Sequence, residues 1–143
     1  MNGYLAAAVA AIFVWLGMVL AISFLEAPLK FRAPGVTIQL GLGIGRLVFR
    51  ALNVCEVVLA AIALGALVLG RAQTGVLVAA GIAVAALGAQ VVAVRPALTR
   101  RSDAVLADPH VAQAGRSHAH VVYVAFELVK VFALVVGGIL LLA

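Results

Sequence analysis

Charged and hydrogen-bonding side chains recur at helical spacing inside two apolar segments of this chain. In the segment 40–69 they belong to Arg46, Arg50, Asn53 and Glu56. On the last apolar segment and the residues just before it, they belong to Arg116, His120, Tyr123, Glu127 and Lys130. At about 100° per residue, the first set spans roughly a third of the helix circumference and the second an arc of about 80°. Two such stripes can face each other, so the sequence predicts a polar site between two helices.

Three of these charges are expected at the same depth. If Arg46 and His118 mark one membrane interface, a rise of about 1.5 Å per residue places the other charges near the bilayer middle. These deep charges are Glu56, Glu127 and Lys130. A charge there costs several kcal/mol unless it is paired. We therefore expect Glu56 and Glu127 to share Lys130.

The other charged residues are expected nearer the helix ends. Arg46 and Arg50 lie closer to the surface, and Glu26, which closes the first apolar segment, could pair with an arginine. In this arrangement the buried carboxylates would accept protons and the arginines would attract anions. The alternative is structural, because paired buried charges can also do no more than set the register of two helices.

A metal site is a weaker alternative. His120, Glu56 and Glu127 offer the imidazole and carboxylate ligands that first-row transition metals accept. His120 and Glu127 are two turns apart, however, and no paired-histidine spacing accompanies them. No cofactor is therefore expected, and a metal or haem stays the lesser possibility.

The whole composition indicates a membrane protein. Of 143 residues, 66% are hydrophobic and 10% charged, against roughly 45–50% and 25% in soluble domains. About 20 apolar residues span a bilayer as a helix, and four segments have that length: 5–25, 40–69, 74–94 and 119–142. The alternation of barrel strands is absent. We expect a single all-α domain over 1–143, an integral membrane four-helix bundle whose first segment is a retained span.

Prolines and glycines predict where these helices end and meet. Pro28 and Pro96 should end the first and third helices, because proline disfavours helical geometry in the residue before it. Gly41 and Gly45 have the spacing of a close helix contact. They lack the preceding strand and the lysine of a phosphate-binding loop.

Basic residues predict the orientation. Eight of the ten lie in or beside the first and third loops: Lys30, Arg32, Arg46, Arg50, Arg95, Arg100, Arg101 and Arg116. The second loop carries Arg71. By the positive-inside rule, loops one and three face the cytoplasm and both termini face outward, in a cytoplasmic (inner) membrane. The net charge of +5 therefore reports topology, and no nucleic-acid partner is expected.

Three short motifs carry a resemblance to a known family. They are Trp15-Leu16-Gly17, the segment 24–31 that reads FLEAPLKF, and Gly45-Arg46-Leu47-Val48-Phe49. With a histidine at the start of the last span, they resemble the small four-helix membrane proteins of the transmembrane protein 205-like group and its uncharacterised bacterial relatives. The resemblance implies a four-helix fold and little about function. The pair at 127 and 130 departs from that pattern.

Three functions fit these features. The first is transport of a proton, an ion or a small polar solute along the polar stripes, for which so short a chain would form a homo-oligomer. The second is a membrane enzyme acting on a lipid, a quinone or an isoprenoid, with His120 or Glu127 as acid or base. The third is a non-catalytic subunit or scaffold of a larger membrane complex. The sequence favours transport, and all three functions imply the lipid bilayer as a partner, with a homo-oligomer or a larger membrane complex expected as well.

Overall fold

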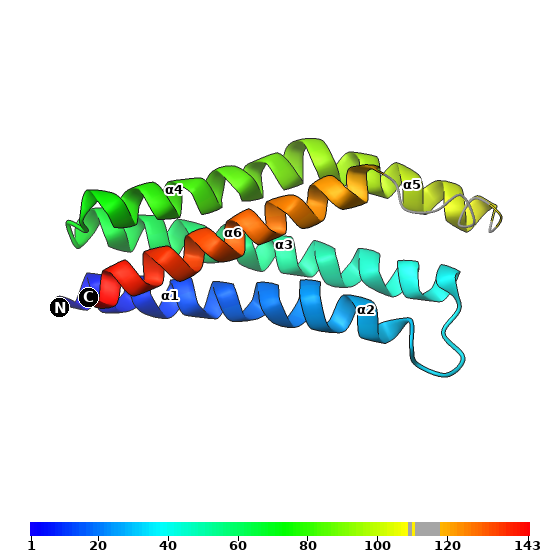
Figure 1. Ribbon diagram of the computed structural model, residues 1–143, viewed down its shortest axis with the longest axis horizontal. Helices are drawn as coiled ribbons and strands as arrows, with labels where there is room; N and C mark the ends of the chain where they lie inside the picture. Colours follow the sequence, from blue (N-terminus) through cyan, green and yellow to red (C-terminus); the bar gives the residue numbers. More distant parts are fainter. Residues whose placement is uncertain (109, 111–117) are drawn as a thin grey trace.

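Four long helices make up the chain (Figure 1). The computed structural model describes residues 1–108, 110 and 118–143. In this part of the chain there are no strands, so the predicted all-helical class is confirmed. The first long helix runs through α1 (Gly3–Val19), the π-helical segment η1 (Leu20–Glu26) and α2 (Ala27–Lys30). The others are α3 (Ile38–Leu69), then α4 (Thr74–Ala89) continued by π-helical η2 (Gln90–Val94) and α5 (Arg95–Ala107), and α6 (His118–Leu142).

Local sequence explains where the helices begin and turn. The side chains of Asn2 and Thr37 cap α1 and α3 by accepting the backbone N–H of the residue three positions on. The tight turn after α3 places Arg71 at a φ of 55°. The Asn2 amide donates to the carbonyl of Gly70 at 3.2 Å. This contact holds the N-terminus against the α3–α4 turn, at the end where the C-terminus also lies (Figure 1).

The prediction that Pro28 and Pro96 end their helices is wrong. The helices continue to Lys30 and Ala107, beyond the predicted ends of the segments 5–25 and 74–94. A proline removes one N–H donor and crowds the carbonyl four residues earlier. Each proline follows a π-helical segment, in which backbone N–H groups bond to the carbonyl five residues back, as Ala27 does to Ile22. This local widening lets the helix pass the proline without ending.

Small side chains fill the interior of the bundle and large apolar side chains face outward, unlike in a soluble protein. The helix contacts are built largely from alanine, with Ala8 and Ala63 at 1% exposure or less. Larger apolar side chains point outward, as Val92 and Phe132 do, at 77% and 72% exposed. Small residues at contacts and large apolar residues outside are typical of helices packed in lipid. All four helices are long and apolar enough to cross a membrane.

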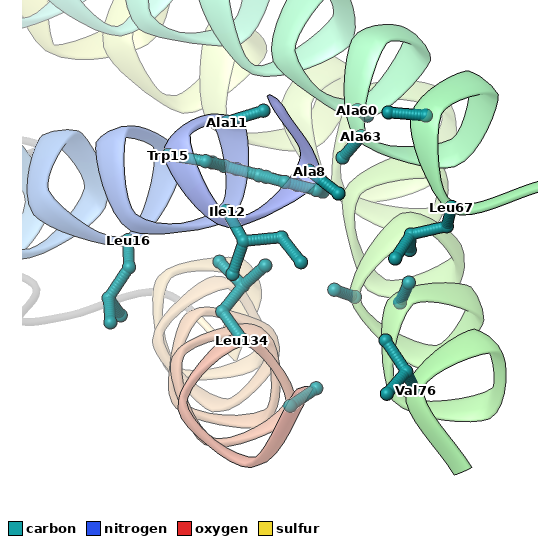
Figure 2. Packing of buried hydrophobic residues seen from close by; sticks show 14 of the residues in the cluster. Ala8, Ala11, Ile12, Trp15, Leu16, Ala60, Ala63, Leu67, Val76 and Leu134 are labelled. Atoms are coloured by element: carbon teal, nitrogen blue, oxygen red, sulfur yellow. The ribbon is translucent and has the colours of Figure 1, made fainter. Parts of the chain in front are cut away.

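The buried apolar core draws on α1, α3, α4 and α6. Figure 2 shows Trp15 lying between α1 and the alanines of α3, while Ile12 and Leu134 point toward each other across the α1–α6 contact. Trp15, at 1% exposed, is the largest fully buried side chain among the described residues. Its placement brings its ring nitrogen to the middle of the bundle.

Gly41 and Gly45 lie at a helix contact, as expected from their spacing. A Cβ atom at Gly41 would lie within 3 Å of the Phe31 ring, and one at Gly45 would lie 2.7 Å from Nζ of Lys30. The two glycines therefore let the end of the first helix approach α3 closely. Gly65, Gly81 and Gly88 have open space around them and make no such contact.

Candidate functional site

A buried ion cluster lies at the centre of the bundle. Nζ of Lys130 is 2.5 Å from Oε1 of Glu56 and 2.7 Å from Oε1 of Glu127. The three side chains are 0–1% exposed. The expectation that Glu56 and Glu127 share Lys130 is thus confirmed. Each carboxylate needs this cation, because an unpaired charge in a low-dielectric interior is very unfavourable.

Gln90 and Trp15 complete the cluster from the other two long helices. The Gln90 amide nitrogen donates to Glu127 at 2.7 Å, and its oxygen accepts from Lys130 at 2.7 Å. The Trp15 ring nitrogen donates to Oε1 of Glu56 at 2.9 Å. Lys130 therefore directs its three N–H donors at three acceptors. All four long helices meet in this network.

Asn53 extends the network toward the end of the bundle that holds the first loop and α5. With its amide oriented to satisfy both neighbours, the nitrogen donates to Oε2 of Glu56 at 3.1 Å and the oxygen accepts from the Arg95 guanidinium. The connected charged groups are then the carboxylates of Glu56 and Glu127 and the cations of Lys130 and Arg95. The formal charges of the network therefore sum to zero. Arg95 reaches inward because the third helix continues past Pro96.

A cavity of about 570 Å³ opens beside this network. It lies between the end of the first helix, the start of α3, α5 and the start of α6. Its polar lining residues include Lys30, Arg46, Arg95, Arg101, His120, Asn53, Tyr123 and Glu127. The volume is within the range of roughly 300–1,000 Å³ that small-molecule sites occupy. The cavity thus connects the basic end of the bundle with the buried Glu127.

Four polar atoms of cavity-lining residues are buried without a hydrogen-bond partner in the described part of the chain. They are Oε2 of Glu127, Nε of Arg46, the hydroxyl of Tyr123 and the hydroxyl of Ser23. Buried polar groups are rarely left unsatisfied, and such exceptions gather where a ligand, water or proton binds. The Tyr123 ring is held by an edge-to-face contact with Phe49, whose centroid is 5.8 Å away.

The remaining predicted residues divide into two groups. Arg46 and His120 line the cavity, and Arg46 also pairs with Asp103 of α5 at 2.5 Å. Arg50 is exposed and Glu26 lies outside the cavity lining. The sequence suggested an arginine partner for Glu26, but in the described part of the chain Glu26 pairs with Lys30 at 3.6 Å, because the helix continues by one turn. Arg116 is outside the described residues.

Sequence reasoning missed several contributors. Gln90 is the single amide or charged side chain between residues 75 and 94. A lone amide in so apolar a segment could have indicated a buried polar partner. Arg95 was counted as a loop residue because Pro96 was expected to end the helix. No sequence signal distinguishes Ser23 from a serine that simply bonds its own helix. Trp15 is not among the site residues that the sequence predicted, but its ring nitrogen donates to Glu56.

The donor set does not resemble a metal centre. In the described residues, no group of three or more histidine, cysteine or acidic side chains is placed to hold a metal ion. The ammonium of Lys130 occupies the space between the two carboxylates where a cation would sit. His120, the imidazole of the metal hypothesis, lines the cavity and is exposed.

Replacing Trp15 by Phe is expected to destabilise the protein by about 1.5–3 kcal/mol, the contribution of a hydrogen bond to a charged group. The smaller ring also leaves a cavity, so a double-mutant comparison is needed to separate the bond to Glu56 from packing. Unfolding by denaturing detergent, followed by circular dichroism, measures the loss. In a Glu56→Gln background the loss should shrink, since the bond is then no longer charge-assisted. An undiminished loss would assign the effect to packing.

Comparison of the chain with protein-family models, curated proteins and solved structures found no match. The resemblance to the transmembrane protein 205-like group stays a prediction from the sequence.

Proposed function

We propose that this chain is an integral membrane protein that transports a proton, an ion or a small polar solute through the cavity and past the buried ion cluster. The membrane part of the proposal rests on the four long apolar helices and on the outward-facing large apolar side chains. A surface of that kind in water would aggregate, whereas in lipid it is the expected solvent-facing layer.

The orientation follows from the ends of the bundle. The first loop and α5 lie at one end, and both termini lie at the other (Figure 1). Lysine and arginine concentrate at the first of these ends, and Arg71 lies in the α3–α4 turn at the other. Under the positive-inside rule the end with the cavity mouth faces the cytoplasm.

One observation carries the transport proposal: the cavity reaches a buried carboxylate that still has a free oxygen. Glu127 is 1% exposed, shares Lys130 with Glu56, and has Oε2 without a partner in the described part of the chain. That lone pair can take a proton arriving through the cavity. Protonation would leave Lys130 with a single charged carboxylate, Glu56, and thereby change the forces between α3 and α6. A purely structural ion pair has no need of an access route.

Glu127→Gln tests this function. Purified protein is reconstituted in liposomes that contain a pH-sensitive dye, and proton flux is driven by a potassium diffusion potential. We expect flux above that of empty liposomes for the unaltered protein, and a loss of at least about tenfold in the variant, because a glutamine cannot carry the proton. Asp108→Asn, an exposed acidic residue at the end of α5, should retain flux.

Equal flux in the Glu127→Gln protein and the unaltered protein would contradict the proposal. Flux no greater than in empty liposomes would point instead to a subunit that needs a larger partner.

A further inference from the structure

We propose that the cavity binds a small organic anion in which a phosphate or carboxylate group is joined to an apolar body. This inference rests on the proposed function, because it names the substrate class of the same cavity. Three features of the lining support it: the sign of its charges, the composition of its walls and the free donors that face it.

The charge of the lining is strongly one-sided. Of its described residues, Lys30, Arg46, Arg95 and Arg101 are cationic and Glu127 is acidic. Several of these charges are paired: Glu127 with Lys130, Lys30 with Glu26 and Arg46 with Asp103. The lining still holds more cationic than acidic side chains. The four cations come from the first helix, α3 and α5. Their convergence on one space favours an anion and opposes a cation.

The arginines are suited to an oxyanion. One terminal nitrogen of Arg46 pairs with Asp103, but its Nε is buried without a partner in the described part of the chain. An unsatisfied buried N–H is unfavourable until an acceptor arrives. Guanidinium groups match the planar geometry of carboxylate and phosphate oxygens. The Tyr123 hydroxyl lies beside the Glu127 carboxylate at the inner end of the cavity.

The walls between these groups are apolar and aromatic. They include Phe24, Phe31, Phe49, Leu42, Leu98 and Val124. Nζ of Lys30 lies 5.6 Å from the Phe31 ring centroid and 5.5 Å from that of Phe49, so cation and aromatic surface form one unit. Inorganic phosphate would lose hydration against these rings without a matching gain, whereas an alkyl group would bury there favourably. Phe24 and Phe31 are 38% and 42% exposed, so the apolar wall continues to the outer surface of the bundle.

Calorimetric titration of the whole protein in a non-ionic detergent tests the inference. The probes are hexyl phosphate, inorganic phosphate and hexyltrimethylammonium. We expect hexyl phosphate to bind, inorganic phosphate to bind at least about tenfold more weakly, and the cation not to bind. Arg46→Gln and Arg95→Gln should each weaken hexyl phosphate binding by about tenfold or more. Arg50→Gln is the matched control, one turn from Arg46 but exposed and outside the lining, and should leave the affinity unchanged.

Binding of the cation as strongly as the anion, or equal losses in Arg50→Gln and Arg46→Gln, would overturn the inference. Native mass spectrometry of protein released from membranes identifies the source of the anion. A stoichiometric phospholipid that Arg95→Gln loses assigns a lipid headgroup, and hexyl phosphate binding without retained lipid assigns a soluble anion.

The two proposals fail in different ways. Hexyl phosphate binding without proton flux, in the presence or absence of hexyl phosphate, would remove proton transport and keep the ligand class. Proton flux without hexyl phosphate binding would remove the ligand class and keep the transport function.

Discussion

Replacing Lys130 by Met is expected to destabilise the protein by about 3–5 kcal/mol, the cost of breaking a buried ion pair from one side. Lys130 is fully buried and is the direct partner of both Glu56 and Glu127. Methionine fills a similar volume but leaves two carboxylates near each other without the shared ammonium. Few other single changes in the described chain would create so much uncompensated charge.

Detergent-induced unfolding followed by circular dichroism measures this loss. Arg100→Met, an exposed cation of α5, is the control and should change stability by less than about 0.5 kcal/mol. Adding Glu56→Gln to the Lys130→Met protein should recover part of the loss, because one of the two stranded charges is removed. A double change that is fully additive would show that the two side chains do not interact.

Gln90→Leu is expected to destabilise the protein by about 2–3 kcal/mol, through buried polar partners left unsatisfied. Gln90 accepts from Lys130 and donates to Glu127 and to the carbonyl of Tyr123 at 3.2 Å. Leucine is close to glutamine in size and suits an apolar helix. Helix propensity and packing alone would therefore predict no loss of stability. The expected effect therefore isolates the hydrogen-bond network.

The same unfolding measurement on Gln73→Leu provides the comparison. Gln73 precedes α4, is exposed, and makes no side-chain cap. Its replacement should leave stability nearly unchanged. Should Gln90→Leu be as stable as the unaltered protein, the network would have no energetic role, and the third helix would be held by its alanine contacts alone.

Helical periodicity was sufficient to predict the three charged residues of the ion cluster. Glu56, Glu127 and Lys130 are single charges in long apolar runs, and burial of such charges is tolerated only when they pair. Their distances from the helix ends placed them at one depth, which left few possible partners. Arg50 was predicted to belong to the site, but its side chain is exposed. It lies about 120° from Glu56 around α3, at the edge of the stripe, and whether an edge residue faces inward depends on where the neighbouring helices lie.

The sequence by itself determined the all-helical fold class, the number of long apolar helices and the three buried charges that must pair, because these follow from composition and periodicity. The tertiary structure decided which helices meet at the cluster and where the cavity forms. The π-helical segments before Pro28 and Pro96 carry both helices past their prolines. That continuation brings Arg95 to Asn53 and Lys30 beside α3. The sequence-based expectation for a proline considers only the proline and the residue before it. The shift to π-helical hydrogen bonds that accommodates the proline depends on packing along the whole helix.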